Sequence, residues 1–400
     1  MNTAGIVAEY NPFHNGHKFH IEKTRQKTGV DCIAVVLSGS FTQRCEPAVM
    51  SKWARAKTAV LSGVDVVFEL PFSFSTASAE GFARGAVGLF NALKCVDIIS
   101  FGSENGDIKE LNAVKEVLLS DEIDEKIKLE LKKGVTYASA RQKAAADILG
   151  AEETMLLKSP NNILAVEYLK ALSFFSSSIT PFTIQRTGTG YHDKSIKGSF
   201  ASASHIRGLI MSGSEDFIKA MPQSAAEILK EEYQKGLAPA NLNRLERDII
   251  AKIRSIGEKG LVSVPEVSEG LEKRIFKAAM DNNSLENILN AAKTKRYTMS
   301  RLRRIVLWAY LDVKSKHLCD FTPYIRVLAF NDKGREFLRL AGKKSKIPII
   351  TKAADAYNCL SQKGKNIFDL EAKATDIWGL CTPEIQKGGL DFTNSPIYIS

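Results

Sequence analysis

The sequence predicts an α/β fold, a Rossmann-like doubly wound parallel sheet, followed by a mainly helical and basic C-terminal region. Four short apolar runs rich in β-branched residues occur early in the chain, at 5–10, 32–39, 64–70 and 96–102. The segments between them, 17–28, 49–62 and 78–93, have the length and the alanine-rich composition of crossover helices. Near-continuous apolar strands separated by helices are typical of a parallel sheet covered on both faces. The ligands of such sheets bind at the carboxyl ends of the strands.

The length of 400 residues favours two domains. We expect an ATP-binding catalytic domain over 1–210 and a mainly helical α+β region over 211–400. Helices are predicted over 123–131, 138–149, 164–175, 245–256, 271–280, 284–293 and 299–314, strands over 180–186, 324–330 and 347–351, and a polar Gly/Ser/Thr-rich loop over 187–200.

Composition predicts a cytoplasmic protein without a membrane segment. The apolar fraction of 44% and the charged fraction of 25% are ordinary for globular proteins. The six cysteines include no Cys-x-x-Cys pair, which argues against a zinc ribbon or a disulfide framework and fits a reducing compartment. The N-terminus lacks the pattern of a signal peptide, and no apolar run approaches the length of a membrane span. The sequence leaves the oligomeric state open.

The net charge of +10 is concentrated in one segment. Residues 290–352 carry 16 Lys/Arg against 4 Asp/Glu, a local excess of 12, so the rest of the chain is close to neutral. Such a concentration indicates either a surface that binds a polyanion or a solvated basic face.

The stretch from Val7 to His17 has the features of a phosphate site. A strand ends, Pro12 makes a turn, and two histidines flank Gly16 where a helix is expected to begin. A helix N-terminus offers free N–H groups and the positive end of the dipole, and glycine lets a nucleotide approach closely. Two imidazoles can each donate a hydrogen bond to phosphate oxygens as charge builds. A structural role and a metal site formed by His14, His17 and His20 are the alternatives, and no known metal motif matches the latter.

His14-Asn15-Gly16-His17 resembles the HxGH motif of the nucleotidylyltransferase superfamily. Further segments sharpen the resemblance, namely SGSFTQRCEPA (38–48), FELP (68–71), SAEGFARGAV (78–87), FGSE (101–104), PNNILAVEYLKAL (160–172) and KTKRYTMSRLRR (293–304). In this order they are similar to the bacterial tRNA-Met cytidine acetate ligase family over most of the chain.

The resemblance implies a two-step reaction. Acetate attacks the α-phosphate of ATP to give acetyl-adenylate and pyrophosphate, and the 4-amino group of the wobble cytidine of elongator tRNA-Met then takes the acetyl group. Mg²⁺ is expected on the phosphates as a charge neutraliser. The implied catalytic residues are His14 and His17. The implied ATP-binding residues are Val7, Ala8, Glu9, Tyr10, Asn11, Pro12, Phe13, His14, Asn15, Gly16, His17, Lys18, Phe19, His20, Gly102, Asn162 and Arg186.

The residues themselves leave alternatives at several of these positions. Gly102 fits an ordinary turn as well as a resting place for a purine or ribose, and Asn162 fits a helix cap. Arg186 can fork onto a phosphate or pair with a carboxylate. A second phosphate element is expected at Ser202–Arg207, where Ser204 and Arg207 open a helix, although a plain serine cap explains it too. Lys52 is expected either to reach the triphosphate or to lie on a solvated face.

One position departs from the family pattern. Cys45 stands where the family usually has glycine in the QRGEPA-like segment. If that glycine needs positive φ, the loop here is strained or shaped differently, which puts Gln43 and Arg44 in doubt as substrate contacts. A thiol nucleophile is not expected, because no partner base is identifiable nearby.

A basic segment is predicted to bind the anticodon region of the tRNA. In 293–313, one helical face is apolar and should pack inward, and the arginines should point away from it. The expected tRNA-binding residues are Lys293, Lys295, Arg296, Arg301, Arg303 and Arg304. Tyr297 or Trp308 is expected to stack on a base.

Two other functions remain open on the sequence alone. A small-molecule nucleotidyltransferase explains the HxGH site but leaves the basic helix without a role. A nucleotide-responsive RNA-binding protein without catalysis explains both features but performs no ATP–pyrophosphate exchange with acetate.

Overall fold

One mixed sheet organises the molecule. The computed structural model describes residues 1–186 and 199–400, so most of the loop expected at 187–200 lies outside the described residues. The strands are β1 (Thr3–Ala8), β2 (Cys32–Ser38), β3 (Val66–Leu70), β4 (Ile98–Ser103), β5 (Thr180–Gln185), β6 (Ile325–Phe330), β7 (Ile349–Ile350) and β8 (Ile397–Tyr398). All the strands expected from the sequence are confirmed, and β8 was not expected.

The strand order creates a switch point beside β1. In space the order is β5-β4-β1-β2-β3-β6-β7, with β8 paired to β6. The first five strands run parallel, so the chain winds outward from β1 to β3 and then returns to the other side of β1 for β4 and β5. Ligands of doubly wound sheets bind where the strand order reverses in this way. The doubly wound α/β class is therefore confirmed, and it predicts a site at the carboxyl ends of β1 and β4.

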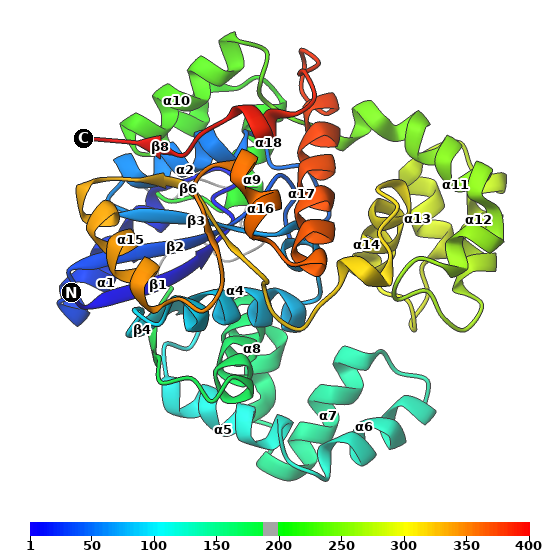
Figure 1. Ribbon diagram of the computed structural model, residues 1–400. Coiled ribbons are helices and arrows are strands. Elements are labelled where there is room, and N and C mark those ends of the chain that lie inside the picture. The colour runs from blue at the N-terminus through cyan, green and yellow to red at the C-terminus, as the bar shows by residue number, and fades with distance from the viewer. Residues whose placement is uncertain (187–198) are drawn as a thin grey trace.

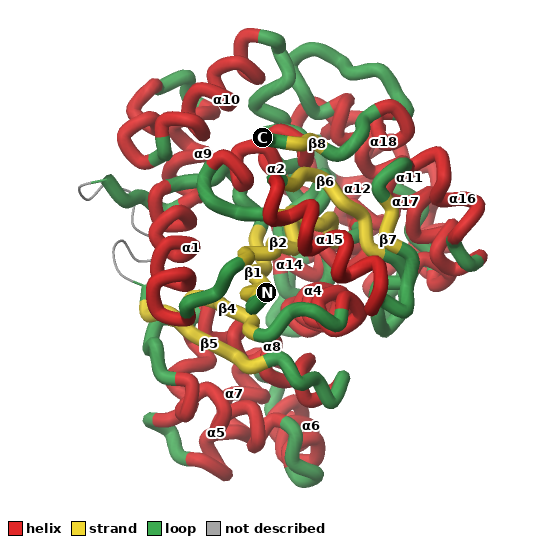
Figure 2. The backbone as a smooth tube through the Cα atoms, turned by 60° about the vertical axis from the view of Figure 1, so that its left-hand side comes forward, coloured by secondary structure: helices red, strands yellow, loops and turns green. Residues whose placement is uncertain are grey.

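Successive side chains of β2 point to opposite faces of the sheet, and each face packs against an apolar core. Cys32, Ala34 and Val36 join one apolar core, and Ile33 and Val35 join the other. Helices α4, α5 and α8 cover the first face, and α1, α2, α9 and α10 cover the second. Figure 2 shows α1 on one side of β4 and β5, with α8 and α5 on the other.

The predicted helices are present, although α8 begins four residues earlier than predicted, α11 ends six residues later and α14 ends four residues earlier. The helices are α1 (Asn15–Thr28), α2 (Lys52–Leu61), α3 (Phe72–Ser75), α4 (Ala79–Leu93), α5 (Ile108–Leu118), α6 (Ile123–Lys132), α7 (Tyr137–Leu149), α8 (Pro160–Phe174), α9 (Ala203–Met211), α10 (Gln223–Gln234), α11 (Glu246–Val262), α12 (Leu271–Asp281), α13 (Leu285–Ala292), α14 (Met299–Tyr310), α15 (Asp332–Lys344), α16 (Ala356–Cys359), α17 (Gln362–Leu380) and α18 (Leu390–Thr393). Among the described residues, no helix combines the length and the apolar character needed to cross a membrane.

The C-terminal half contains a helical lobe and a return to the sheet. Helices α11 to α14 form a lobe with its own apolar core, which is closed by α17 (Figure 1). Strand β6 then pairs antiparallel with β3, so the segment after residue 320 completes the sheet that the N-terminal segment begins. The domain boundary at residue 210 stays a prediction. The single sheet contains strands from before and after this residue.

Candidate nucleotide site

His14 and His17 fix each other at the start of α1. His14 is the N-cap residue, and its Nδ1 accepts a hydrogen bond from the Gly16 N–H at 3.1 Å. The Nδ1 of His17 accepts from the His14 N–H at 3.2 Å. Because both Nδ1 atoms accept, we assign the proton of each neutral ring to Nε2. Each ring therefore carries its proton on Nε2, and of the two rings only that of His17 lines the neighbouring cavity at the switch point of the sheet, whereas His14 is buried behind it.

The two rings are stacked, and their environment keeps them neutral. Their centroids lie 3.6 Å apart with an angle of 24° between the planes. Burial, together with the charges of Arg186 and Arg207, lowers the pKa of His14 to about 3. Burial and the neighbouring His14 lower the pKa of His17 well below its ordinary value. Neutral rings can stack without repulsion and donate to phosphate without a prior protonation step.

His20 completes a group of three neutral histidines on α1. Its Nε2 lies 3.0 Å from the Ser100 hydroxyl, and burial followed by the Arg186 charge lowers its pKa to about 4. The unfolded chain takes up protons on histidine near pH 6.5, whereas the folded chain does not. These three groups therefore contribute stability that is fully present above pH 6.5 and is lost as the pH falls toward the lowered pKa values.

We expect the free energy of unfolding to fall when the pH is lowered from 7.5 to 5.5. Each histidine contributes up to about 1.4 kcal/mol per pH unit below 6.5. His20→Asn keeps a polar partner for Ser100 and should make this pH dependence shallower. Urea unfolding at several pH values measures the slope. A slope that is the same in His20→Asn and in the parent chain would contradict the assignment for His20.

A cavity of about 280 Å³ opens beside the histidines at the switch point of the sheet. Its walls come from the ends of β1 and β4, the start of α8, the Gln43–Arg44 segment and α9. The predicted residues that line it are Val7, Ala8, Glu9, Tyr10, Asn11, His17, His20, Gly102, Arg186 and Arg207. A Cβ added at Gly102 would stand 3.2 Å from Cγ of Arg186, so glycine lets that side chain lie across β4.

Some residues of the expected ATP-binding stretch lie away from this space. Phe13 is fully buried, the Lys18 ammonium lies 3.9 Å from a Glu22 carboxylate oxygen, and Asn15 donates to the Ser199 carbonyl. They support the turn and the helix rather than line the cavity. The direct ATP contacts assigned to them stay predictions.

Asn162 lies behind the cavity wall, whereas Asn161 lines the cavity. The Asn162 Oδ1 accepts from the Glu104 N–H at 2.8 Å, and the Glu104 carboxylate accepts from the N–H groups of Asn161 and Asn162. This reciprocal arrangement joins the start of α8 to the loop after β4. Asn162 therefore positions Asn161, and its direct contact with ATP stays a prediction.

Arg207 reaches the turn before α1. It donates through Nη1 to the Asn11 carbonyl at 2.9 Å and through Nη2 to the Ser204 hydroxyl at 3.1 Å. Ser202 caps α9 by accepting from the His205 N–H at 3.2 Å. The plain serine cap is therefore present, and Arg207 lines the cavity whereas Ser204 does not. Phosphate binding by Ser204 and Arg207 stays a prediction.

Both expectations for Lys52, contact with the triphosphate and a place on a solvated face, are wrong. Its side chain is fully buried, and its Nζ lies 2.5 Å from Glu69, 2.7 Å from Asp391 and 3.3 Å from Glu371. These carboxylates come from β3, α18 and α17. Burial alone would lower the pKa of Lys52, but the three carboxylates outweigh it and raise the pKa above its usual value. The Lys52 ammonium therefore forms ion pairs that link the N-terminal and C-terminal halves of the chain.

Cys45 adopts the backbone conformation that the glycine of the family pattern suggests. Its φ is 56°, and the loop is closed by the Thr42 N–H, which donates to the Glu46 carbonyl at 3.0 Å. The Glu9 carboxylate also accepts from the Gln43 N–H at 2.7 Å, which fixes the loop against β1. Gln43 and Arg44 line the cavity despite this departure. Burial raises the pKa of the Cys45 thiol to about 12, so it remains a thiol at neutral pH.

The basic segment is less exposed than its sequence indicated. Arg304 was expected to point outward, but it is buried and its guanidinium forks onto the Glu266 carboxylate at 2.5 to 3.0 Å. Arg303 pairs with Glu46 at 2.8 Å, and Arg301 donates to the Glu266 carbonyl at 2.6 Å. Glu266 lies 38 residues before Arg304, which explains why the helical pattern alone misplaced it.

The two aromatic residues that were expected to stack on a base are instead buried and hydrogen-bonded within the protein. Trp308 is buried and donates to the Thr76 hydroxyl at 2.9 Å, and the buried Tyr297 donates to the Glu269 carbonyl at 3.1 Å. Both rings belong to the core of the helical lobe. The expectation that one of them stacks on a base is therefore wrong for this arrangement. Lys293, Lys295 and Arg296 are exposed at the approach to α14.

Several cavity residues were not found from the sequence. They are Asn161, Phe82, Phe101 and Tyr168, together with Ala79, Pro160, Leu164 and Ala203. Aromatic and small apolar residues at such positions look like ordinary core residues in a single sequence. Only the position of FGSE and PNNIL beside the predicted switch point could have suggested them.

Comparison with known proteins places the chain among nucleotidyl transferases. Residues 1–391 match the family model described as HIGH Nucleotidyl Transferase. A tRNA(Met) cytidine acetate ligase of Thermoanaerobacter sp. (strain X514) is 43% identical, and the match covers 98% of each chain. A tRNA(Met) cytidine acetate ligase of Acetivibrio thermocellus is 39% identical over 99% of this chain and 100% of its own.

Solved structures agree with the sequence comparisons. The crystal structure of Thermotoga maritima TmcAL bound with alpha-thio ATP superposes with a TM-score of 0.94 at 36% identity and covers 100% of both chains. The apo form of the same protein gives a TM-score of 0.95 at 35% identity, again over the full length of both chains.

Proposed function

The chain belongs to the tRNA(Met) cytidine acetate ligase family, and we propose that it activates acetate with ATP and transfers the acetyl group to the wobble cytidine of elongator tRNA-Met. The observation that supports this proposal most is the stacked His14–His17 pair at the start of α1, in which each Nδ1 accepts a backbone N–H hydrogen bond. A cytoplasmic location follows from the tRNA substrate.

In the first step, an acetate oxygen attacks the α-phosphorus of ATP. A new P–O bond forms, the bond to the β-phosphate oxygen breaks, and pyrophosphate leaves. Negative charge builds on the phosphate oxygens, where His14, His17 and the N-terminus of α1 offer hydrogen-bond donors. Arg186 and Arg207 add positive charge at the same cavity. These fixed donors need no reorganisation as the charge develops.

In the second step, the 4-amino nitrogen of the cytidine attacks the acetyl carbonyl carbon. A C–N bond forms, the C–O bond to the adenylate breaks, and AMP leaves while the nitrogen loses one proton. The target base must leave its stack to reach the adenylate, and RNA loops present such bases readily. The product is N4-acetylcytidine.

Mg²⁺ is proposed to enter as part of the ATP complex. Among the described residues, no group of three or more His, Cys, Asp or Glu is arranged to hold a metal ion. Glu9 is the carboxylate on the cavity wall, and one of its oxygens already accepts from the Gln43 N–H. The triphosphate oxygens would therefore supply most of the ligands, and the ion would neutralise their charge.

The tRNA surface is proposed to start at the exposed cations before α14. Lys293, Lys295 and Arg296 are exposed there, and Arg301 and Arg303 follow on the helix. Arg304 is reassigned from tRNA contact to the Glu266 ion pair. The Glu46–Arg303 pair can open at low cost, because both partners are about 40% exposed and surface pairs contribute little.

Replacing Lys293, Lys295 and Arg296 together with alanine should weaken tRNA binding and leave acetate-dependent ATP–pyrophosphate exchange unchanged. Loss of about three phosphate contacts should make the salt dependence shallower by roughly two to three units in the logarithmic slope. Filter binding between 50 and 200 mM salt, run on elongator tRNA-Met, measures this slope. The same replacement at Lys126, Lys128 and Lys132 on α6 is the matched control. An unchanged slope in the first variant would place the tRNA elsewhere.

Incubation with ATP, labelled acetate and total tRNA tests the function itself. We expect acid-precipitable label, and nuclease digestion should place it in a single nucleoside, N4-acetylcytidine. A small-molecule nucleotidyltransferase would leave the tRNA unlabelled, and a non-catalytic RNA-binding protein would also show no pyrophosphate exchange. Either result would overturn the proposal.

A further inference from the structure

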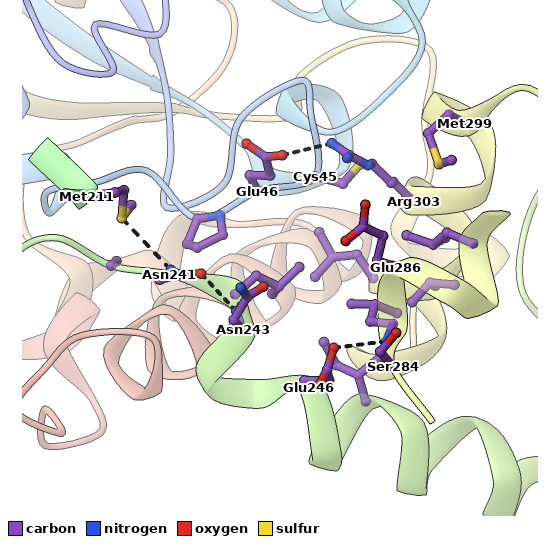
Figure 3. A pocket seen from close by; sticks show the side chains of 18 of the residues that line it. Cys45, Glu46, Met211, Asn241, Asn243, Glu246, Ser284, Glu286, Met299 and Arg303 are labelled. Carbon is purple, nitrogen blue, oxygen red and sulfur yellow. Dashed lines mark hydrogen bonds and ion pairs between the residues drawn. The ribbon is translucent and has the colours of Figure 1, made fainter. Parts of the chain in front are cut away.

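A second, larger cavity lies next to the nucleotide cavity. Its volume is about 570 Å³, and it is enclosed by the Cys45–Val49 loop, α9, the start of α11, α13 and α14 (Figure 3). It therefore lies between the sheet domain and the helical lobe. The proposed reaction brings a nucleoside of the tRNA to an adenylate in the nucleotide cavity, and the larger cavity is the neighbouring space from which a nucleoside can approach it.

The two cavities share a thin wall. Arg207 lines both of them, and the adjacent residues Arg44 and Cys45 line the nucleotide cavity and the larger cavity, respectively. The loop that carries Arg44 and Cys45 is held by backbone hydrogen bonds and by Glu9. A group bound in the larger cavity would therefore lie next to an adenylate held at Arg207.

The lining of the larger cavity suits a pyrimidine base. Apolar surface in the lining comes from Leu285 and Leu289 on α13 and from Met299 and Val306 on α14. Such surface can contact the face of a base, and the cations before α14 and Arg303 supply positive charge for the attached phosphates.

Glu286 is a solvent-exposed residue of α13 whose carboxylate lines the cavity. Figure 3 shows its carboxylate pointing into the space below Cys45 and Arg303. In the part of the chain that the structure describes, this carboxylate has no hydrogen bond or ion pair. Asn290 lines the cavity four residues later on the same helix and offers an amide. A carboxylate accepts from the 4-amino group of cytosine, and an amide N–H donates to a ring acceptor.

We propose that this cavity receives the acceptor cytidine and that Glu286 selects it by accepting a hydrogen bond from its 4-amino group. This inference rests on the proposed function and assigns the second substrate site within it. A uridine in the same place would present a carbonyl oxygen to the carboxylate and would be repelled. Glu286 thus reads the same amino group that the reaction acetylates.

Glu286→Ala tests the selection step. We expect kcat/KM for tRNA acetylation to fall roughly 10-fold to 100-fold, the range for loss of one base-specific contact. Glu286→Gln keeps an acceptor oxygen and should lose less. Acetate-dependent pyrophosphate exchange and tRNA affinity should stay near those of the parent chain, because neither needs the base contact. Glu258→Gln on α11, an exposed glutamate away from the cavity, is the matched control.

Gly208→Phe tests the cavity independently of Glu286. A Cβ at Gly208 meets no heavy atom within 4 Å, so the ring can extend into the cavity without displacing the backbone. We expect pyrophosphate exchange to persist and acetyl transfer to tRNA to be lost. Normal acetylation by both Gly208→Phe and Glu286→Ala would overturn the inference while leaving the proposed function intact. A parent chain that never labels tRNA would instead overturn the proposed function.

Discussion

Replacing His17 with alanine is expected to lower acetate-dependent ATP–pyrophosphate exchange by roughly 100-fold or more. The loss follows because the ring offers an Nε2–H where charge develops on the departing pyrophosphate, and because its Nδ1 also holds the His14 N–H at 3.2 Å. Removing it deletes one donor and loosens the cap that orients the other. The measurement is incorporation of labelled pyrophosphate into ATP at saturating acetate.

Measuring tRNA binding distinguishes a loss of catalysis in His17→Ala from general damage to the fold. His17→Ala should bind tRNA like the parent chain, because the exposed cations before α14 lie in a different lobe. Lys27→Ala, an exposed position on the last turn of α1, is the control and should exchange at the parental rate. Unchanged exchange in His17→Ala would remove the histidine pair from the phosphate site.

The largest effect on stability is expected for Lys52→Met. Lys52 is fully buried among Glu69, Glu371 and Asp391, and Arg326 is the second cation of the cluster. Burial and the Glu69 charge raise the pKa of Glu371 well above its ordinary value, so removing the Lys52 charge affects the whole cluster. Without Lys52, one buried negative charge has no partner, which costs about 3–5 kcal/mol. Urea unfolding should show this loss as a lower midpoint.

A second substitution tests whether charge balance is the cause. Adding Asp391→Asn to Lys52→Met removes a negative charge that has lost its Lys52 partner and should recover roughly 1–2 kcal/mol, the size expected for directly coupled residues. Lys57→Met, one and a half turns away on α2 and only partly buried, should change the free energy of unfolding by less than about 0.5 kcal/mol. Equal losses at Lys52 and Lys57 would show that the cluster contributes nothing particular to stability.

Local sequence patterns were enough to predict the parallel sheet and the position of the cavity at its switch point. The strands β1 to β5 follow from apolar runs separated by helices, and the place of the ligand follows from the winding order that such runs imply. The histidine pair followed from a motif whose parts are neighbours in sequence. Its stacking and its reciprocal Nδ1 hydrogen bonds required the structure.

Long-range charge pairing was the main feature that the sequence did not disclose. Lys52 finds Glu371 and Asp391 more than 300 residues away, and Arg304 finds Glu266 across the helical lobe. A single sequence shows each of these cations as an available positive charge. For the same reason the antiparallel pairing of β6 with β3 was not predicted, because the sequence of a short apolar strand does not identify the strand that it pairs with.

The fate of the acetate oxygens tests most directly whether the histidine site transfers an adenylyl group to acetate. The enzyme would be supplied with ATP, elongator tRNA-Met and acetate carrying ¹⁸O in both oxygens, and the products would be analysed by mass spectrometry. Attack of acetate on the α-phosphorus places one ¹⁸O in the AMP that is released and leaves the other in the acetyl group of the cytidine. AMP without ¹⁸O, or ADP in place of AMP, would contradict this chemistry.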